Sequence, residues 1–183
     1  MSAANSVSNS LRGISSRISN EMSEREVESA FLQEGFFSSL EYQGIGHDLR
    51  SEWKLPDNSR PDYATLDENQ RVTAVYEFKN PTESLGDHVD QLFGYTEELK
   101  ADFGILTNGH IVRVYRRENG THTRLYEVEV DDFSEDQIAD LADRLSKPRW
   151  DSTDADTVSD YISDIEPVSL ANELGRDEFY NTF

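Results

Sequence analysis

The chain has 183 residues and a mass of 20.9 kDa, the size of one domain with a short appended segment. Acidic residues outnumber basic ones 37 to 17 and the formal net charge is −20, yet the 36% of hydrophobic residues are enough for a packed core. The absence of cysteine excludes disulfide bonds, thiol catalysis and zinc–thiolate sites. The sequence contains no apolar run of about 18 residues, the length that a membrane span needs, and it does not open with a signal-like segment. We therefore expect a cytoplasmic protein.

The acidic residues are spread along the chain, and arginine outnumbers lysine 13 to 4. Such a surface repels nucleic acid at low ionic strength. At molar salt the Debye length falls to about 3 Å and the repulsion nearly disappears. The composition is typical of a halophilic protein, so the net charge does not exclude DNA as a partner.

The N-terminal third is predicted to hold a leader and one helix. Residues 1–20 are rich in Ser and Asn without a sustained period, which predicts a disordered leader before a domain over 21–148. A helix should begin at Ser23, because Ser23 and Glu26 have the spacing of a capping box, and Gly35 should end it.

Strands and helices alternate through the rest of the predicted domain. Turn residues separate three predicted strands, at 49–54, 61–66 and 71–79. Alternation along the third strand places Glu77 and Lys79 on one face of the sheet and the following residues on the other: Val72, Ala74, Tyr76 and Phe78.

A second helix is predicted over 84–100, and a last helix from Ser134 to the residue before Pro148. Between them the pattern predicts strands at 103–107, 110–116 and 124–130. We therefore expect an α/β fold with a central mixed sheet flanked by helices. Residues 149–183 are predicted to be an acidic linker and a helical segment that docks on a partner or a further domain.

Asp62, Glu77 and Lys79 are candidates for catalysis. If the strands that carry them are neighbours, both carboxylates converge and the lysine lies one step along. Two carboxylates beside a main-chain carbonyl suit Mg²⁺, and a nearby lysine can orient or deprotonate a water that attacks a phosphate. The alternative is structural: Asp62 is then a turn acid, and Glu77 and Lys79 form an exposed ion pair worth under about 1 kcal/mol.

These residues resemble a known nuclease signature. Pro61-Asp62 followed by Glu77-Phe78-Lys79 resembles the PD-(D/E)xK motif. Residues 91–95 (QLFGY) resemble the Q-x-x-x-Y element on the helix that follows the catalytic strand, and residues 103–109 (FGILTNG) resemble the next strand and turn. The chain is thus similar to the N-terminal nuclease domain of type I restriction enzyme R subunits and of related restriction–modification proteins.

The resemblance implies a restriction-endonuclease-like core and a Mg²⁺-dependent endodeoxyribonuclease in which Mn²⁺ also supports the reaction. Asp62, Glu77 and the Phe78 carbonyl would bind the metal, and Lys79 would act on the water. Glu28 matches the additional acid that many members hold near the metal, although Glu24 lies on the same helix face.

The resemblance also assigns roles on the second predicted helix. Gln91 and Tyr95 would contact the DNA backbone or brace the site, and His88, on the same face, is a weaker candidate to join them.

The first functional hypothesis is a DNA endonuclease of a restriction or defence system. It would be either a small subunit or a domain of a larger restriction–modification protein. Its expected partners are DNA and a second copy of the chain. A further partner would supply specificity, methyltransferase or translocase activity, either as a separate subunit or as a fused domain. The alternative is a non-cleaving module of the same fold that binds DNA or a partner protein. A third hypothesis is an acidic mimic of DNA, for which the catalytic residues would have no use.

Overall fold

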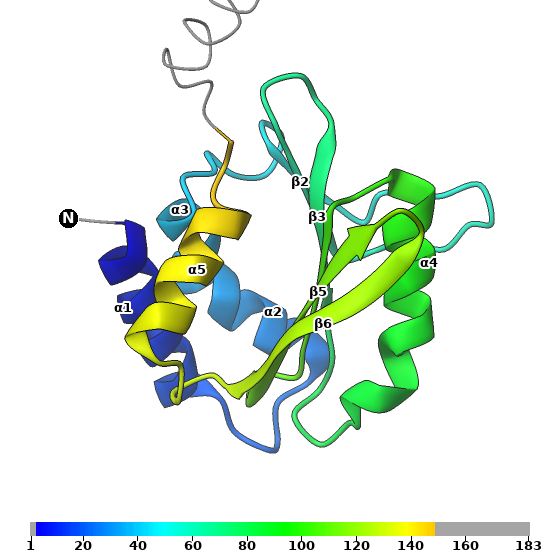
Figure 1. Ribbon diagram of the computed structural model, residues 1–183. Helices are drawn as coiled ribbons and strands as arrows, with labels where there is room; N and C mark the ends of the chain where they lie inside the picture. Colours follow the sequence, from blue (N-terminus) through cyan, green and yellow to red (C-terminus); the bar gives the residue numbers. More distant parts are fainter. Residues whose placement is uncertain (1–2, 149–183) are drawn as a thin grey trace, which may run out of the picture. The chain divides into compact units, whose positions relative to one another are not determined.

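The computed structural model describes residues 3–148, whose six strands form one mixed sheet (Figure 1). The strands are paired in chain order: β1 (Leu49–Ser51), β2 (Tyr63–Leu66), β3 (Val72–Phe78), β4 (Phe103–Thr107), β5 (Ile111–Glu118) and β6 (Thr121–Glu129). All neighbours are antiparallel except β3 and β4, which are parallel. The predicted α/β fold with a central mixed sheet is confirmed.

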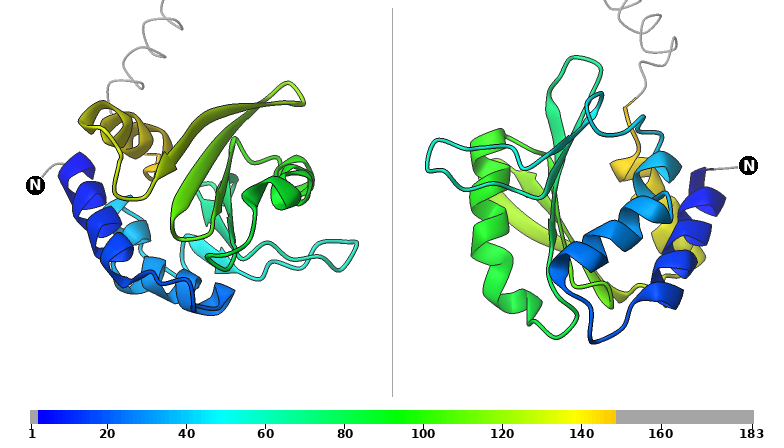
Figure 2. Two further views of the ribbon diagram at one scale, coloured as in Figure 1. Left: turned by 90° about the horizontal axis from the view of Figure 1, so that it is seen from below. Right: turned by 180° about the vertical axis from the view of Figure 1, so that it is seen from behind.

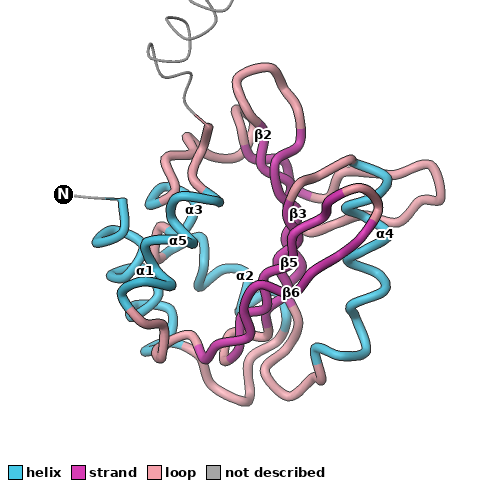
Figure 3. Tube along the Cα trace, in the orientation of Figure 1, coloured by secondary structure: helices cyan, strands magenta, loops and turns pink. Residues whose placement is uncertain are grey.

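Helices cover both faces of this sheet (Figures 2 and 3). One layer contains α1 (Ala3–Arg17), α2 (Glu24–Gln33), α3 (Phe36–Ser39) and α5 (Glu135–Leu145), and the other contains the short 3-10 helix η1 (Leu85–His88) and α4 (Val89–Leu99). Helix α4 is the crossover between β3 and β4, as a parallel strand pair requires. Both predicted capping boxes are present, at Ser23 and at Ser134.

Each face of the sheet has its own hydrophobic core. Beneath α2 and α3 the core is aromatic, with edge-to-face contacts among Phe31, Phe36, Phe37, Tyr76 and Phe78. Such contacts add to the gain of about 1.5–3 kcal/mol from burying each large side chain. Beneath α4 the core is smaller and mostly aliphatic. β3 contributes to both cores and is buried along nearly its whole length, which holds its C-terminal end in place.

Val72 of β3 faces the side of the sheet opposite to the prediction. The pairing of β2 with β3 shifts register, so that Thr65 opposes Ala74 while Leu66 opposes Val72. This bulge reverses the alternation, because one residue of β3 is left over. Val72 therefore packs with Val75 in the core beneath α4.

The prediction of a disordered leader over residues 1–20 is wrong. Residues 3–17 form α1, which packs against α3 and α5, and its Val7, Leu11 and Ile14 are buried. These three residues recur at helical spacing, and their contact with the neighbouring helices stabilises a Ser-rich segment of low helix propensity. Helix α1 and the sheet belong to the same compact unit, and this unit ends at Pro148.

The predicted acidic linker and C-terminal segment over 149–183 lie outside the described residues. Within the described part of the chain, no helix has the length and apolar character needed to cross a membrane.

Candidate active site

Asp62 and Glu77 lie opposite each other where β2 begins and β3 ends. Tyr63 pairs with Tyr76, which places Asp62 beside Glu77 across the two strands. The Glu77 Oε1 accepts the main-chain N–H of Asp62 at 3.2 Å, and the Asp62 Oδ2 accepts the N–H of Phe78 at 2.7 Å. The predicted convergence of the two carboxylates is therefore present in the structure.

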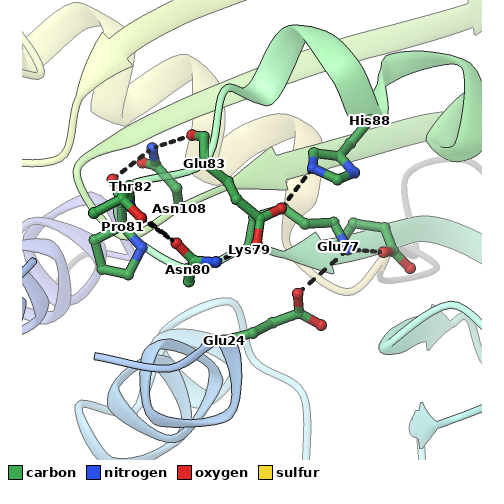
Figure 4. Close-up of polar contacts among 9 residues, drawn as sticks. All are labelled: Glu24, Glu77, Lys79, Asn80, Pro81, Thr82, Glu83, His88 and Asn108. Atoms are coloured by element: carbon green, nitrogen blue, oxygen red, sulfur yellow. Dashed lines mark hydrogen bonds and ion pairs between the residues drawn. The ribbon is translucent and has the colours of Figure 1, made fainter. Parts of the chain in front are cut away.

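Lys79 follows β3 and completes the cluster (Figure 4). Its Nζ donates a hydrogen bond to Glu77 Oε2 at 3.1 Å and lies 3.6 Å from Glu24 Oε2 on α2. Glu77 is 2% exposed and Lys79 is 7% exposed. The alternative of an exposed surface ion pair is therefore wrong, because both partners are buried.

The site holds more negative charge than its lysine compensates. Burial raises the pKa of Asp62 to about 6, against the lowering effects of the Phe78 N–H and of Lys79. Burial, and then the charge of Asp62, raise the pKa of Glu77 to about 7. Burial lowers the pKa of Lys79, but Glu77, Glu24 and Asp62 together outweigh it and leave that pKa raised. Lys79 therefore stays protonated at neutral pH, while the two carboxylates give up their protons only near neutrality.

Both candidate acids of α2 face this cluster, in different ways. Glu24 forms the ion pair with Lys79, whereas Glu28 accepts a hydrogen bond from the Tyr63 hydroxyl. The charges of both acids contribute to raising the pKa of Asp62. The structure thus brings Glu28 to the site, where it is held by the residue that follows Asp62.

Three oxygen donors at this position suit a hard cation. Because the N–H of Phe78 points to Asp62, the carbonyl of Phe78 lies on the same side of β3. A hard divalent cation such as Mg²⁺ needs only one or two protein carboxylates and completes its shell with water. Among residues 3–148, no group of three His, Cys, Asp or Glu side chains is arranged to hold a metal ion. Asp62, Glu77 and the main-chain oxygen of Phe78 are the groups here that could hold such an ion.

Gln91 and Tyr95 contact each other one turn apart on α4. The Gln91 Nε2 donates to the Tyr95 hydroxyl at 2.7 Å. Gln91 is exposed, whereas Tyr95 is 4% exposed and packs in the core beneath α4. His88 does not join them, because its Nε2 lies 2.7 Å from Glu83 Oε2.

A network after β3 was not found from the sequence. Asn80 donates to the Glu83 carboxylate and accepts from Thr82, so residues 80–83 form a compact turn (Figure 4). Asn108, in the turn between β4 and β5, donates to the main-chain oxygens of Pro81 and Glu83. The Asn108-Gly109 pair indicated a hairpin, but the side chain of Asn108 also fixes the turn that follows Lys79.

Comparison with known proteins places these residues in a matched region. The family model described as the type I restriction enzyme R protein N terminus matches residues 44–132, just under half of the chain. This range contains Asp62, Glu77, Lys79, Gln91 and Tyr95. None of the curated proteins matches the chain.

Two proteins are among those whose solved structures are similar to this chain. DrdV, in a cryo-EM complex with DNA, has a TM-score of 0.53 and 18% identity over 80% of this chain and 14% of its own. A fragment described as an HsdR subunit of a type I restriction enzyme from Vibrio vulnificus YJ016 has a TM-score of 0.41 and 18% identity over 57% of this chain and 22% of its own. The chain thus spans less than a quarter of each protein, and the likeness to DrdV is one of fold. Over residues 44–132, the chain resembles the N terminus of type I restriction enzyme R proteins.

Proposed function

We propose that this chain is a nuclease domain of a restriction system, which hydrolyses DNA phosphodiester bonds with the help of Mg²⁺ or Mn²⁺. One observation carries the proposal: the half-buried Asp62 and the buried Glu77 lie side by side, and the buried Lys79 is bonded to Glu77. Structural carboxylates gain nothing from such desolvation, whereas perturbed pKa values of this kind are typical of functional sites. The match to the R-protein N terminus over the same residues supports this proposal.

The donor set fits a divalent cation, because two desolvated carboxylates with one lysine leave negative charge to be compensated. Asp62, Glu77 and the Phe78 carbonyl would hold the ion. When bound, a divalent cation supplies Lewis-acid stabilisation of the phosphate and lowers the pKa of a bound water. Main-chain hydrogen bonds hold the two carboxylates in place, and the carboxylates would in turn fix the position of the ion.

Lys79 would orient the attacking water or the phosphate. Since the surrounding acids keep it protonated, its Nζ acts as a hydrogen-bond donor and not as a base. Held by Glu77 and Glu24, it donates to the attacking water or to a phosphate oxygen and stabilises charge that develops there. Glu28, fixed by Tyr63, is positioned as the additional acid.

The proposed partners are DNA and a protein that supplies sequence specificity. DrdV was solved with DNA, and this chain spans 14% of it. We infer that the domain receives its sequence specificity from a partner subunit or a fused domain, and that two copies act together for double-strand cleavage. The −20 charge makes molar salt the condition in which DNA approaches most readily.

Cleavage of supercoiled plasmid tests this proposal. The parent chain, Asp62→Ala and Lys79→Ala are incubated with Mg²⁺ or Mn²⁺ across a KCl series into the molar range. Nicking or linearisation that requires metal and is lost in both variants supports the nuclease. If the folded parent neither binds metal nor cuts DNA, the nuclease proposal is overturned and the non-cleaving module is favoured.

A further inference from the structure

The loop over residues 52–61, between β1 and β2, is longer than the pairing of these strands requires. It reaches past α4 in each view of the ribbon (Figures 1 and 2). Leu55 anchors it, because that side chain is buried in the core beneath α4. Two main-chain hydrogen bonds, from Leu55 N–H to Ser59 O at 2.9 Å and from Asn58 N–H to Leu55 O at 3.0 Å, give the loop a defined turn.

The exposed charged residues of this loop are of both signs: Lys54 and Arg60 are cationic, and Glu52 and Asp57 are acidic. Lys54 is exposed and makes no ion pair or side-chain hydrogen bond within residues 3–148. Arg60 is also exposed and forms an ion pair of 3.8 Å with the exposed Glu52 of the same loop. The Arg50 guanidinium, on β1, lies 4.9 Å from the centroid of the Trp53 ring, and it makes no ion pair within residues 3–148.

The acidic neighbours of the loop are placed differently. Asp57 accepts hydrogen bonds from Ser59 inside the turn. Asp90 and Glu98 of α4 line a cavity of about 340 Å³ between that helix and the loop. Within residues 3–148, Lys54 is therefore the cation of the loop that has no acidic partner, and Arg60 has only a long ion pair between two exposed side chains.

Arg60 lies next to the site. Arg60 is two residues before Asp62, so their Cα atoms are at most about 7 Å apart. Pro61 between them is buried, whereas Arg60 is exposed and Asp62 partly exposed. The loop is also closed at the site, because the Glu52 N–H donates to the Asp62 carbonyl at 3.0 Å.

A polyanion needs cations close to a site that contains Glu24, Glu28, Asp62 and Glu77. We propose that Arg60 and Lys54, supported by Arg50 stacked on Trp53, bind backbone phosphates of the DNA strand that enters the active site. Phosphate contacts of this kind fix the register of a duplex without reading its sequence. This inference rests on the proposed nuclease function and names the surface that holds its substrate.

The test measures DNA affinity separately from cleavage. All variants carry Asp62→Asn, which keeps an oxygen acceptor for the Phe78 N–H but prevents cutting. Lys54→Ala/Arg60→Ala is compared with Arg12→Ala/Arg71→Ala, which removes the same charge. Arg12 is exposed on α1 in the other helical layer, and Arg71 is exposed in the turn between β2 and β3. Binding of a short fluorescent duplex is followed by anisotropy against salt concentration.

We expect the loop variant to bind several-fold more weakly and to lower the slope of log K against log salt by about 2, one per lost phosphate contact. The control variant should keep the parent slope. Equal affinities and slopes for the two double variants overturn the loop assignment. If the slope depends on the loop but the chain with Asp62 intact never cuts in the plasmid assay, the nuclease proposal fails while the loop surface stands.

Discussion

Asp62 and Glu77 each hold the other's strand through a main-chain N–H. Glu77 accepts from Asp62 itself, and Asp62 accepts from Phe78, the residue after Glu77. The two carboxylates are therefore fixed by the backbone before any ligand binds, at the cost of burying two like charges together. Their geometry and their raised pKa values have the same cause, and substitution of either residue will change both.

Stability without metal should fall as the pH rises from about 4 to about 7. Unfolded Asp and Glu titrate near pH 4, whereas burial keeps Asp62 protonated up to about 6 and Glu77 up to about 7. The folded state binds more protons across this interval, so the free energy of unfolding decreases with pH and then levels off. Urea unfolding at a series of pH values in EDTA measures this slope.

Asp62→Asn isolates one carboxylate of the pair. The amide cannot ionise and keeps the bond to Phe78, so at pH 8 we expect its free energy of unfolding to exceed that of the parent by about 2 kcal/mol. Glu98→Gln, at an exposed position of α4, removes the same charge and serves as the control. Equal stabilisation by both substitutions would assign the gain to net charge and contradict the burial effect.

Lys79→Met should abolish cleavage while preserving metal binding. The substitution removes the donor near the reacting phosphate, for which we expect a loss of activity of at least roughly a hundred-fold. The site becomes more negative, so calorimetry with Mn²⁺ should show binding at least as tight as in the parent. Lys79→Arg keeps the charge with a different geometry and should recover only part of the activity. Full activity of Lys79→Met would remove the lysine from the mechanism.

Much of the site could be predicted because its determinants are local in sequence or follow from strand pairing. The convergence of Asp62 and Glu77 needed only two short strands to be neighbours and the alternation of side chains. The capping boxes at Ser23 and Ser134 were visible as residue pairs three apart. In each case one short stretch of sequence contains the physical cause.

The features that were missed depend on contacts between distant segments. Asn108 fixes the turn after Lys79 through bonds to Pro81 and Glu83, which leave no local pattern. The bulge that turns Val72 toward α4 depends on the pairing with Leu66. Helix α1 has low intrinsic propensity, and packing against other helices overrides it.

Gln91 and Tyr95 should behave as a brace for α4. Tyr95→Phe and Gln91→Ala each remove the same 2.7 Å hydrogen bond, so each should lower the free energy of unfolding by about 0.5–1.5 kcal/mol. The double variant should lose little more than either single one, a coupling that a double-mutant cycle measures. DNA affinity should stay at the parent value. Additive losses of stability, together with weaker DNA binding by Gln91→Ala, would favour a direct DNA contact.

Leu11→Ala tests whether α1 is part of the folded domain. Leu11 is 2% exposed in the core that α1 shares with α3 and α5, so its truncation should lower the free energy of unfolding by about 2–5 kcal/mol. Asn9→Ala is the matched control, because Asn9 is exposed on the same helix and alanine has the higher helix propensity. Urea unfolding at constant pH and salt gives both values.

The segment that follows α1 contacts the turn between β4 and β5, which contains Asn108. This contact gives the test a second readout. The chain after α1 places Ile18 against Gly109, and Asn20 lies 2.8 Å from the His110 ring. Deletion of residues 1–20 should therefore weaken the turn that contains Asn108 and reduce cleavage along with stability. A truncated chain with parent stability and activity would show that the helix contributes nothing. Leu11→Ala with an unchanged midpoint would lead to the same conclusion, because a disordered leader has no core contact to lose.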